Sequence, residues 1–215
     1  MTKICIFGNS ITYGACDIEF GGWVQRLRKF LDEKAKQNPQ LYFDVYNLGV
    51  SGDTTEDLLK RFEIEAKARL AELDEGEDAI IIFAIGINDS QYIHDKASLR
   101  VPEREFRENI KKLINLAKKF TSKLIFVGLT PVDETKTTPI PWNTNKSYKN
   151  EHIQKYNQII KLICKDNKIW FIEIFEKWIK SDFKKLLEDG LHPNSLGHKN
   201  IFENVKEFLI KNKVI

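Results

Sequence analysis

The stretch Lys3-Ile4-Cys5-Ile6-Phe7-Gly8-Asn9-Ser10-Ile11-Thr12-Tyr13-Gly14 decides how the rest of the chain is arranged. Its apolar run predicts a buried strand that ends at Gly8, and a serine follows two residues later. This order would place the Ser10 hydroxyl at the carboxyl edge of a parallel sheet, where open α/β sheets have their clefts. Ser10 could instead cap the first turn of a helix, as serines often do.

The rest of the chain alternates short apolar runs with segments whose apolar residues recur at helical spacing. The run at 79–85 is apolar at every position, which is typical of a central parallel strand covered by helices on both faces. Strands alternating with helices predict one three-layer α/β domain with a parallel sheet, spanning residues 1–215. We predict further strands at 42–46, 79–85, 124–129 and 169–172, and helices that begin near residues 22, 54, 102, 153 and 194.

Polar residues follow several of the predicted strands at the same end of the sheet. Ser10 follows the first strand, Gly52 the second and Asn88 the third, while Asp189 and His192 precede the final helix. In a doubly wound sheet these loops share one edge, so the five residues are expected to meet. Each also has an ordinary structural explanation: a turn glycine, a hydrogen-bonding loop asparagine, or one of four histidines.

These residue types suit nucleophilic attack on an ester. A serine hydroxyl needs a base to remove its proton, and His192 is the candidate base for Ser10. Asp189 could accept the other imidazole N–H and so fix the tautomer. The oxyanion formed by the attack needs donors, which the backbone N–H groups of Ser10 and Gly52 and the Asn88 amide could supply.

Four motifs in this order resemble those of the SGNH (GDSL-type) hydrolases, a superfamily of esterases, lipases and acyl-carbohydrate deacetylases. The resemblance extends over nearly the whole length of the chain. The motifs are Phe7-Gly8-Asn9-Ser10-Ile11-Thr12, Gly49-Val50-Ser51-Gly52-Asp53-Thr54, Gly86-Ile87-Asn88-Asp89 and Asp189-Gly190-Leu191-His192-Pro193.

The resemblance implies both a fold and a set of site residues. It implies a three-layer, flavodoxin-like α/β/α domain whose five parallel strands have the order 2-1-3-4-5. It implies Ser10 as the nucleophile with Asp189 and His192 as the rest of the triad. It also implies Gly52 and Asn88 as oxyanion donors beside the Ser10 N–H, and neither a metal nor an organic cofactor.

The chain departs from the family pattern at one position in the first motif. Asn9 stands where the family usually has Asp before the nucleophile. That position supports the loop, and an amide can still form the hydrogen bond without the negative charge. We therefore expect a change in loop rigidity or rate, and the same type of reaction.

The composition is that of an ordinary soluble domain, with 42% hydrophobic and 30% charged residues and a net charge of +3. Basic pairs at helical spacing predict solvated helix faces, and no basic cluster indicates a nucleic-acid partner. No apolar run is long enough to cross a bilayer, and no leader precedes the first strand. The three cysteines form no disulfide framework or metal-ligand spacing. We therefore expect a cytoplasmic protein, and its oligomeric state is left open.

The function expected from these observations is hydrolysis of carboxylic acyl esters, with short-chain acyl or acetyl groups favoured. An acyltransferase with the same triad would differ only in its acceptor. A non-catalytic module that binds phosphate or a nucleotide at the same sheet edge is the alternative of a different class. The segment 131–149 has no clear periodicity, and its Trp142 and Tyr148 could line a pocket or anchor the segment on the core.

Overall fold

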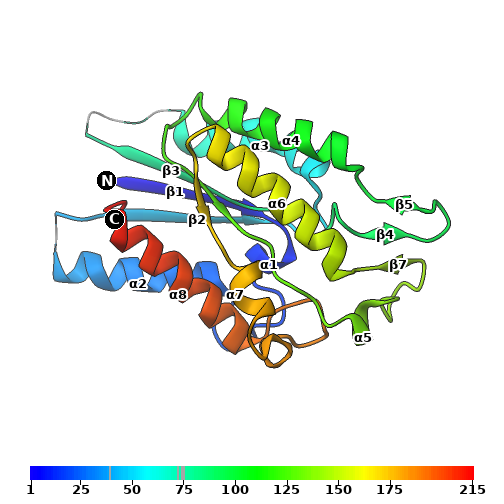
Figure 1. The fold of residues 1–215 in the computed structure, drawn as a ribbon. Coiled ribbons are helices and arrows are strands. Elements are labelled where there is room, and N and C mark those ends of the chain that lie inside the picture. The colour runs from blue at the N-terminus through cyan, green and yellow to red at the C-terminus, as the bar shows by residue number, and fades with distance from the viewer. Residues whose placement is uncertain (39, 72, 74–75) are drawn as a thin grey trace.

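A five-stranded parallel sheet lies at the centre of the computed structural model, which describes residues 1–38, 40–71, 73 and 76–215 (Figure 1). Its strand order is β2-β1-β3-β6-β8, with all four pairings parallel. Counted along the chain within this sheet, the order is 2-1-3-4-5, so the predicted sheet is confirmed. The strands are β1 (Thr2–Gly8), β2 (Phe43–Gly49), β3 (Asp78–Ala84), β6 (Leu124–Val127) and β8 (Trp170–Ile172).

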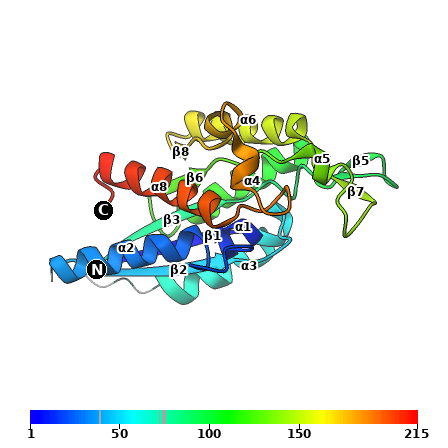
Figure 2. The same ribbon diagram turned by 90° about the horizontal axis from the view of Figure 1, so that it is seen from below.

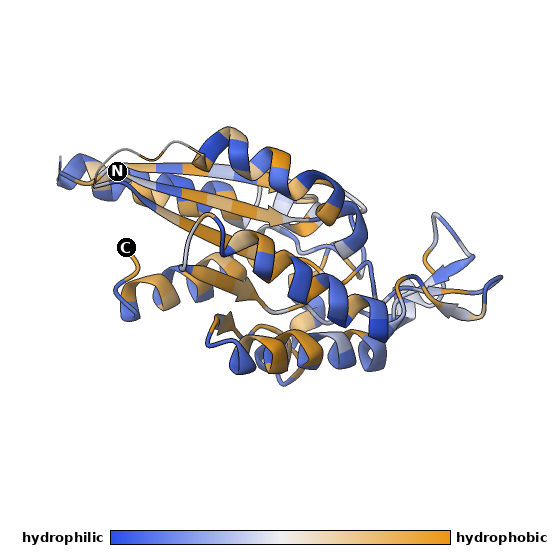
Figure 3. Cartoon of the chain, turned by 90° about the horizontal axis from the view of Figure 1, so that it is seen from above, coloured by the Kyte–Doolittle hydropathy of each residue, from blue (hydrophilic) through white to orange (hydrophobic). Residues whose placement is uncertain are grey.

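The central strands β1 and β3 are apolar on both faces because helices cover both faces of the sheet. Their register pairs Ile4 with Ile80 and Phe7 with Phe83. Figure 3 shows these strands in the colours of apolar residues, while the helices that flank them carry polar residues on their outer sides. Burial of this apolar surface is the main favourable contribution to the stability of the fold.

Five long helices form the two outer layers (Figures 1 and 2). On one face of the sheet α2 (Trp23–Gln37) packs beside α8 (Ser195–Lys211). On the other face α3 (Thr55–Leu70), α4 (Glu103–Ala117) and α6 (Asn150–Asp166) pack in that order. Shorter helical segments lie in the connections: α1 (Ser10–Tyr13), α5 (Glu134–Thr137), α7 (Phe175–Ile179) and the 3₁₀ turn η1 (Phe183–Leu186).

A second, much smaller sheet extends beyond the carboxyl ends of the parallel strands, at the right of Figure 1. It consists of three antiparallel two-residue strands in the order β5-β4-β7. They are β4 (Tyr92–Ile93), β5 (Ser98–Leu99) and β7 (Lys146–Ser147), so the segment 131–149 contributes one strand. The sequence did not predict this sheet, because two residues are too few to show an alternating pattern.

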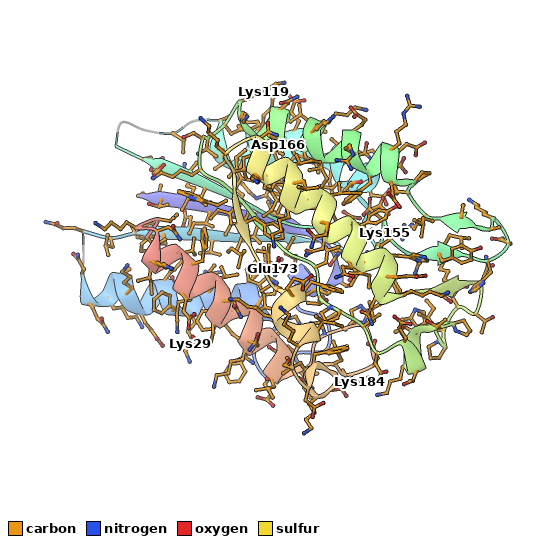
Figure 4. The ribbon with its side chains drawn as sticks, viewed as in Figure 1. Lys29, Lys119, Lys155, Asp166, Glu173 and Lys184 are labelled. Carbon is orange, nitrogen blue, oxygen red and sulfur yellow. The ribbon has the colours of Figure 1, made fainter. Side chains whose placement is uncertain are left out.

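Charged side chains lie on the outer surfaces of many different elements. In Figure 4, Lys29 lies on α2, Lys155 on α6 and Lys184 on η1, each projecting from a separate part of the molecule. None of the helices that the structure describes combines the length and the apolar character needed to span a bilayer.

Candidate active site

Ser10 lies at the sharp turn between β1 and α1. Asn9 is the N-cap of α1, and its side-chain oxygen accepts a hydrogen bond from the Ile11 N–H at 3.1 Å. The amide thus forms the loop hydrogen bond expected at this position, with the Asn9 side chain buried. The end of β2 packs directly on this turn: a side chain at Gly49 would put its Cβ 2.2 Å from the Tyr13 nitrogen. Ser10 is therefore held by the backbone on both sides.

A chain of hydrogen bonds connects Ser10 to residues near the other end of the sequence. Ser10 Oγ lies 3.0 Å from His192 Nε2, although the two residues are 182 positions apart. His192 Nδ1 lies 2.7 Å from Asp189 Oδ2. With Asp189 ionised, Nδ1–H donates to the carboxylate, which leaves the Nε2 lone pair facing the serine hydroxyl.

Asp189 is fixed through both of its carboxylate oxygens. While Oδ2 faces the imidazole, Oδ1 accepts hydrogen bonds from the backbone N–H groups of His192 at 2.7 Å and Leu191 at 2.9 Å. Burial opposes ionisation of this carboxyl, but the hydrogen bonds from the His192 side chain and backbone outweigh burial and lower its pKa to about 2. Asp189 therefore stays negatively charged at neutral and mildly acidic pH.

Asn88 follows β3 and is held at both ends of its amide. Its Nδ2 donates to the Asp53 carbonyl at 2.9 Å, and its Oδ1 accepts from the Tyr148 hydroxyl at 2.7 Å. These two contacts fix the orientation of the amide. The second N–H of Nδ2 takes part in neither of them. Gly52 has φ +87°, in the left-handed region that favours glycine, and no atom lies within 4 Å of where a Cβ would be.

Four of the five candidate residues line one cavity of about 420 Å³: Ser10, Gly52, Asn88 and His192. Asp189 lies behind His192 and contacts it through the hydrogen bonds described above. Trp142 also lines this cavity, with its ring stacked 6.4 Å from the imidazole of His192 and 56% of its surface exposed. A larger hollow of about 590 Å³ lies away from these residues, between α2 and the edge strand β2.

The side chains of the other three histidines make their polar contacts with residues other than Ser10. His198 is buried; its Nδ1 accepts from the Trp23 N–H at 3.3 Å, and its Nε2 lies 2.9 Å from the Ala15 carbonyl. Burial lowers the pKa of His198, so the neutral imidazole ties α8 to the loop before α2. His94 bonds Ser147, and His152 lies beside Glu151.

Cys16 lies beside the Asp189–His192 pair. Its sulfur, a ring nitrogen of His192 and a carboxylate oxygen of Asp189 lie within 4.8 Å of one another, a set of atoms that could hold a metal ion. Burial raises the pKa of the Cys16 thiol, and the charges of Asp189 and Glu188 raise it further. The thiol is therefore protonated, and the His192 and Asp189 atoms already bond each other.

Arg61 on α3 connects the ends of the strands that carry the site. Its guanidinium donates to the Gly8 carbonyl at 3.2 Å, the Leu48 carbonyl at 2.9 Å and the Asp53 carboxylate at 2.7 Å. Asp53 in turn accepts from Asn88 through its backbone oxygen. Arg61 thus holds β1, β2 and the loop after Gly52 together. The sequence does not reveal this role, because the spacing of Arg61 does not distinguish it from other basic residues on the helices.

Comparison with known proteins identifies the family of this chain. Residues 6–199 match the family described as the GDSL-like lipase/acylhydrolase family. The chain belongs to this family. The resemblance inferred from the four sequence motifs is therefore confirmed, and the chain is a GDSL-type ester hydrolase that acts on small ester substrates. This favours an enzyme over the non-catalytic binding module considered above.

Individual relatives agree over almost the whole chain. A GDSL esterase/lipase of Arabidopsis thaliana is 27% identical over 219 residues, which is 96% of this chain and 85% of that protein. The isoamyl acetate-hydrolyzing esterase of Saccharomyces cerevisiae is 26% identical over 213 residues, 92% of this chain and 81% of that protein.

Solved structures share the fold at lower sequence identity. The lipase/acylhydrolase from Enterococcus faecalis has a TM-score of 0.73 and 21% identity, covering 97% of this chain and 95% of that one. Axe2, an acetylxylan esterase from Geobacillus stearothermophilus, has a TM-score of 0.69 and 21% identity, covering 96% and 92%.

We predict that Arg61→Gln lowers kcat for ester hydrolysis by roughly 10- to 100-fold, because loss of charged hydrogen bonds worth ~1.5–3 kcal/mol loosens the loop beside Asn88. KM should change less, since Arg61 does not line the cavity. Arg69→Gln, on the same helix but bonded to the Glu65 carbonyl, is the matched control and should keep its activity. The measurement is steady-state kinetics with thermal unfolding in parallel. Native kcat in a folded Arg61→Gln protein would contradict the positioning role.

Proposed function

We propose that this protein hydrolyses esters of short-chain carboxylic acids, acetyl esters above all, with Ser10 as the nucleophile. The observation that carries the proposal is the hydrogen-bond chain from Ser10 Oγ through His192 to Asp189, at the wall of a cavity. The yeast relative is named for hydrolysis of isoamyl acetate, an ester of the same acyl group. A cavity of about 420 Å³ is at the small end of ligand pockets, which favours a short acyl chain.

In the first half of the proposed reaction His192 acts as the general base. Its Nε2 removes the proton from Ser10 Oγ as the oxygen attacks the ester carbonyl, and Asp189 stabilises the imidazolium that forms. The imidazolium then returns the proton to the departing alkoxide, which leaves as the alcohol. The product of this half-reaction is an acyl group bound covalently to Ser10.

The negative charge on the tetrahedral intermediate is proposed to rest on three donors. These are the backbone N–H groups of Ser10 and Gly52 and the unbonded N–H of Asn88. The orientation of the Asn88 amide by Asp53 and Tyr148 supports this assignment, because a preorganised donor costs no reorganisation during the reaction. In the second half of the reaction, His192 removes a proton from water as the water oxygen attacks the acyl carbonyl. The imidazolium then returns a proton to Ser10 Oγ, and the carboxylic acid leaves.

Ser10→Ala should lower kcat/KM for acetyl esters by roughly 10⁴-fold or more while the protein keeps its fold. Asn88→Ala should lower kcat by on the order of 10²-fold with a smaller change in KM, which is the pattern of a lost oxyanion donor. The measurement is a rate panel of esters that vary in acyl length. Cys16→Ala is the matched control, since its thiol lies beside His192 and is the competing nucleophile. Full activity of a folded Ser10→Ala protein, with inactivation by Cys16→Ala, would contradict the proposal.

The pH profile of kcat/KM should show one acid limb, with activity rising as the pH is raised and then levelling. Only neutral imidazole accepts the serine proton, so protonation of the base removes activity at low pH. Asp189 does not contribute to this limb, because its pKa of about 2 keeps it ionised throughout the range. His198→Gln should leave the profile in place, whereas His192→Ala should abolish activity. If His198→Gln removes the limb and His192→Ala keeps it, the base is wrongly assigned.

A further inference from the structure

The small sheet brings three polar side chains to the cavity that the proposed reaction does not use. Gln91 immediately precedes β4, Arg100 immediately follows β5, and Lys146 lies within β7. The sheet pairs Tyr92 with both Leu99 and Ser147, and the Arg100 N–H donates to the Gln91 carbonyl at 2.7 Å. Gln91, Arg100 and Lys146 all line the cavity that also contains Ser10 and Asn88.

Gln91 is buried, with 3% of its surface exposed, and its side-chain oxygen Oε1 has no hydrogen-bond partner among the described residues. Buried polar atoms in folded proteins almost always have a partner. Four buried side-chain atoms lack one in the described part of the chain, and of their residues only Gln91 lines this cavity. Because Gln91 lines the cavity, a bound ligand is the available source of a donor for its side-chain amide.

Arg100 and Lys146 give the same wall two sets of donors. The Arg100 guanidinium is 3.6 Å from the Asp57 carboxylate, so part of its charge is balanced, and both residues are only partly exposed. Hydroxyl groups suit this combination, because each can donate to Gln91 and accept from Arg100 or Lys146. A phosphate dianion or a carboxylate would bind the cations but offer no hydrogen to Gln91, and an alkyl group would satisfy neither.

We propose that Gln91, Arg100 and Lys146 form a subsite for the alcohol half of the substrate, which selects esters of polyhydroxylated alcohols over esters of simple alkyl alcohols. This inference rests on the proposed function, since it places the alcohol beside the carbonyl that Ser10 attacks. The exposed ring of Trp142 supports it, because its flat face beside His192 can cover the C–H surface of a polyol or sugar ring.

The test compares glycerol 1-acetate with propyl acetate, which have the same acyl group and the same three-carbon alcohol and differ by two hydroxyls. The wild-type protein should show at least a tenfold higher kcat/KM for the glycerol ester, because a site that hydrogen-bonds a hydroxyl discriminates against an analogue lacking it. Gln91→Met should reduce this ratio about tenfold while the rate on propyl acetate stays within twofold. Gln91→Glu, which keeps an acceptor, should retain more of the ratio than Gln91→Met.

Lys146→Met provides a second variant on the partly exposed strand β7 in case Gln91→Met does not fold, and it should also reduce the ratio. Gln154→Met makes the same change as the Gln91 variant on α6, where its side chain bonds Glu176, and should leave both rates unchanged. A wild-type ratio within twofold would overturn the subsite but leave the proposed hydrolysis standing. If kcat/KM for the acetyl ester of glycerol 3-phosphate is at least tenfold higher than for glycerol 1-acetate, the polyol subsite is wrong and the three residues form an anion subsite. Absence of Ser10-dependent hydrolysis of every ester would overturn the proposed function itself.

Discussion

The close approach of β1, β2 and the turn after β1 is the constraint on which the rest of the site depends. A Cβ at Gly8 would lie 2.1 Å from Thr12 Oγ1, and one at Gly49 would lie 2.2 Å from the Tyr13 nitrogen. Contacts this short leave no room for a side chain at either position, so two strand ends pack closely against the helical turn. Arg61 donates to the carbonyls of Gly8 and Leu48 at this point, and the Gly8 carbonyl also accepts from the Val50 N–H.

The third strand is attached to the same edge by a different interaction. Asp89, just after β3, is fully buried and accepts hydrogen bonds from the backbone N–H and hydroxyl of Thr55 at the start of α3. Burial raises the pKa of Asp89 to about 6, although the bonds from Thr55 oppose that rise. Asn109 on α4 completes the cluster by donating to Thr55 Oγ1 at 3.1 Å. Asn88 is therefore held by its own bonds to Asp53 and Tyr148 and is followed by the anchored Asp89. A fixed position suits a donor that has to be in place before charge develops.

The sequence predicted the layers and the sheet because continuous apolar runs and helical spacing are local signals. It also predicted which loops would meet, since the carboxyl ends of parallel strands share an edge whatever lies between them. The strand order came from the family resemblance. For the segment 131–149, the sequence does not decide whether Trp142 and Tyr148 line a pocket or anchor the segment on the core. The structure shows both: Trp142 lies exposed at the cavity, and Tyr148 is buried and also lines it, orienting Asn88. The sequence could not predict the roles of Arg61 and Gln91. The role of Arg61 depends on backbone carbonyls of distant strands, and that of Gln91 on a side-chain oxygen that the tertiary structure leaves without a partner.

Covalent modification by a fluorophosphonate, with the modified residue located by mass spectrometry of peptides, tests directly whether Ser10 is the nucleophile. A serine activated by His192 and Asp189 is far more nucleophilic than any other hydroxyl on the chain. We expect one adduct, on Ser10, which forms rapidly in the wild type, is greatly slowed in His192→Ala and is absent from Ser10→Ala. An adduct on another residue, or ester hydrolysis that continues undiminished in protein that takes up no label, would contradict it.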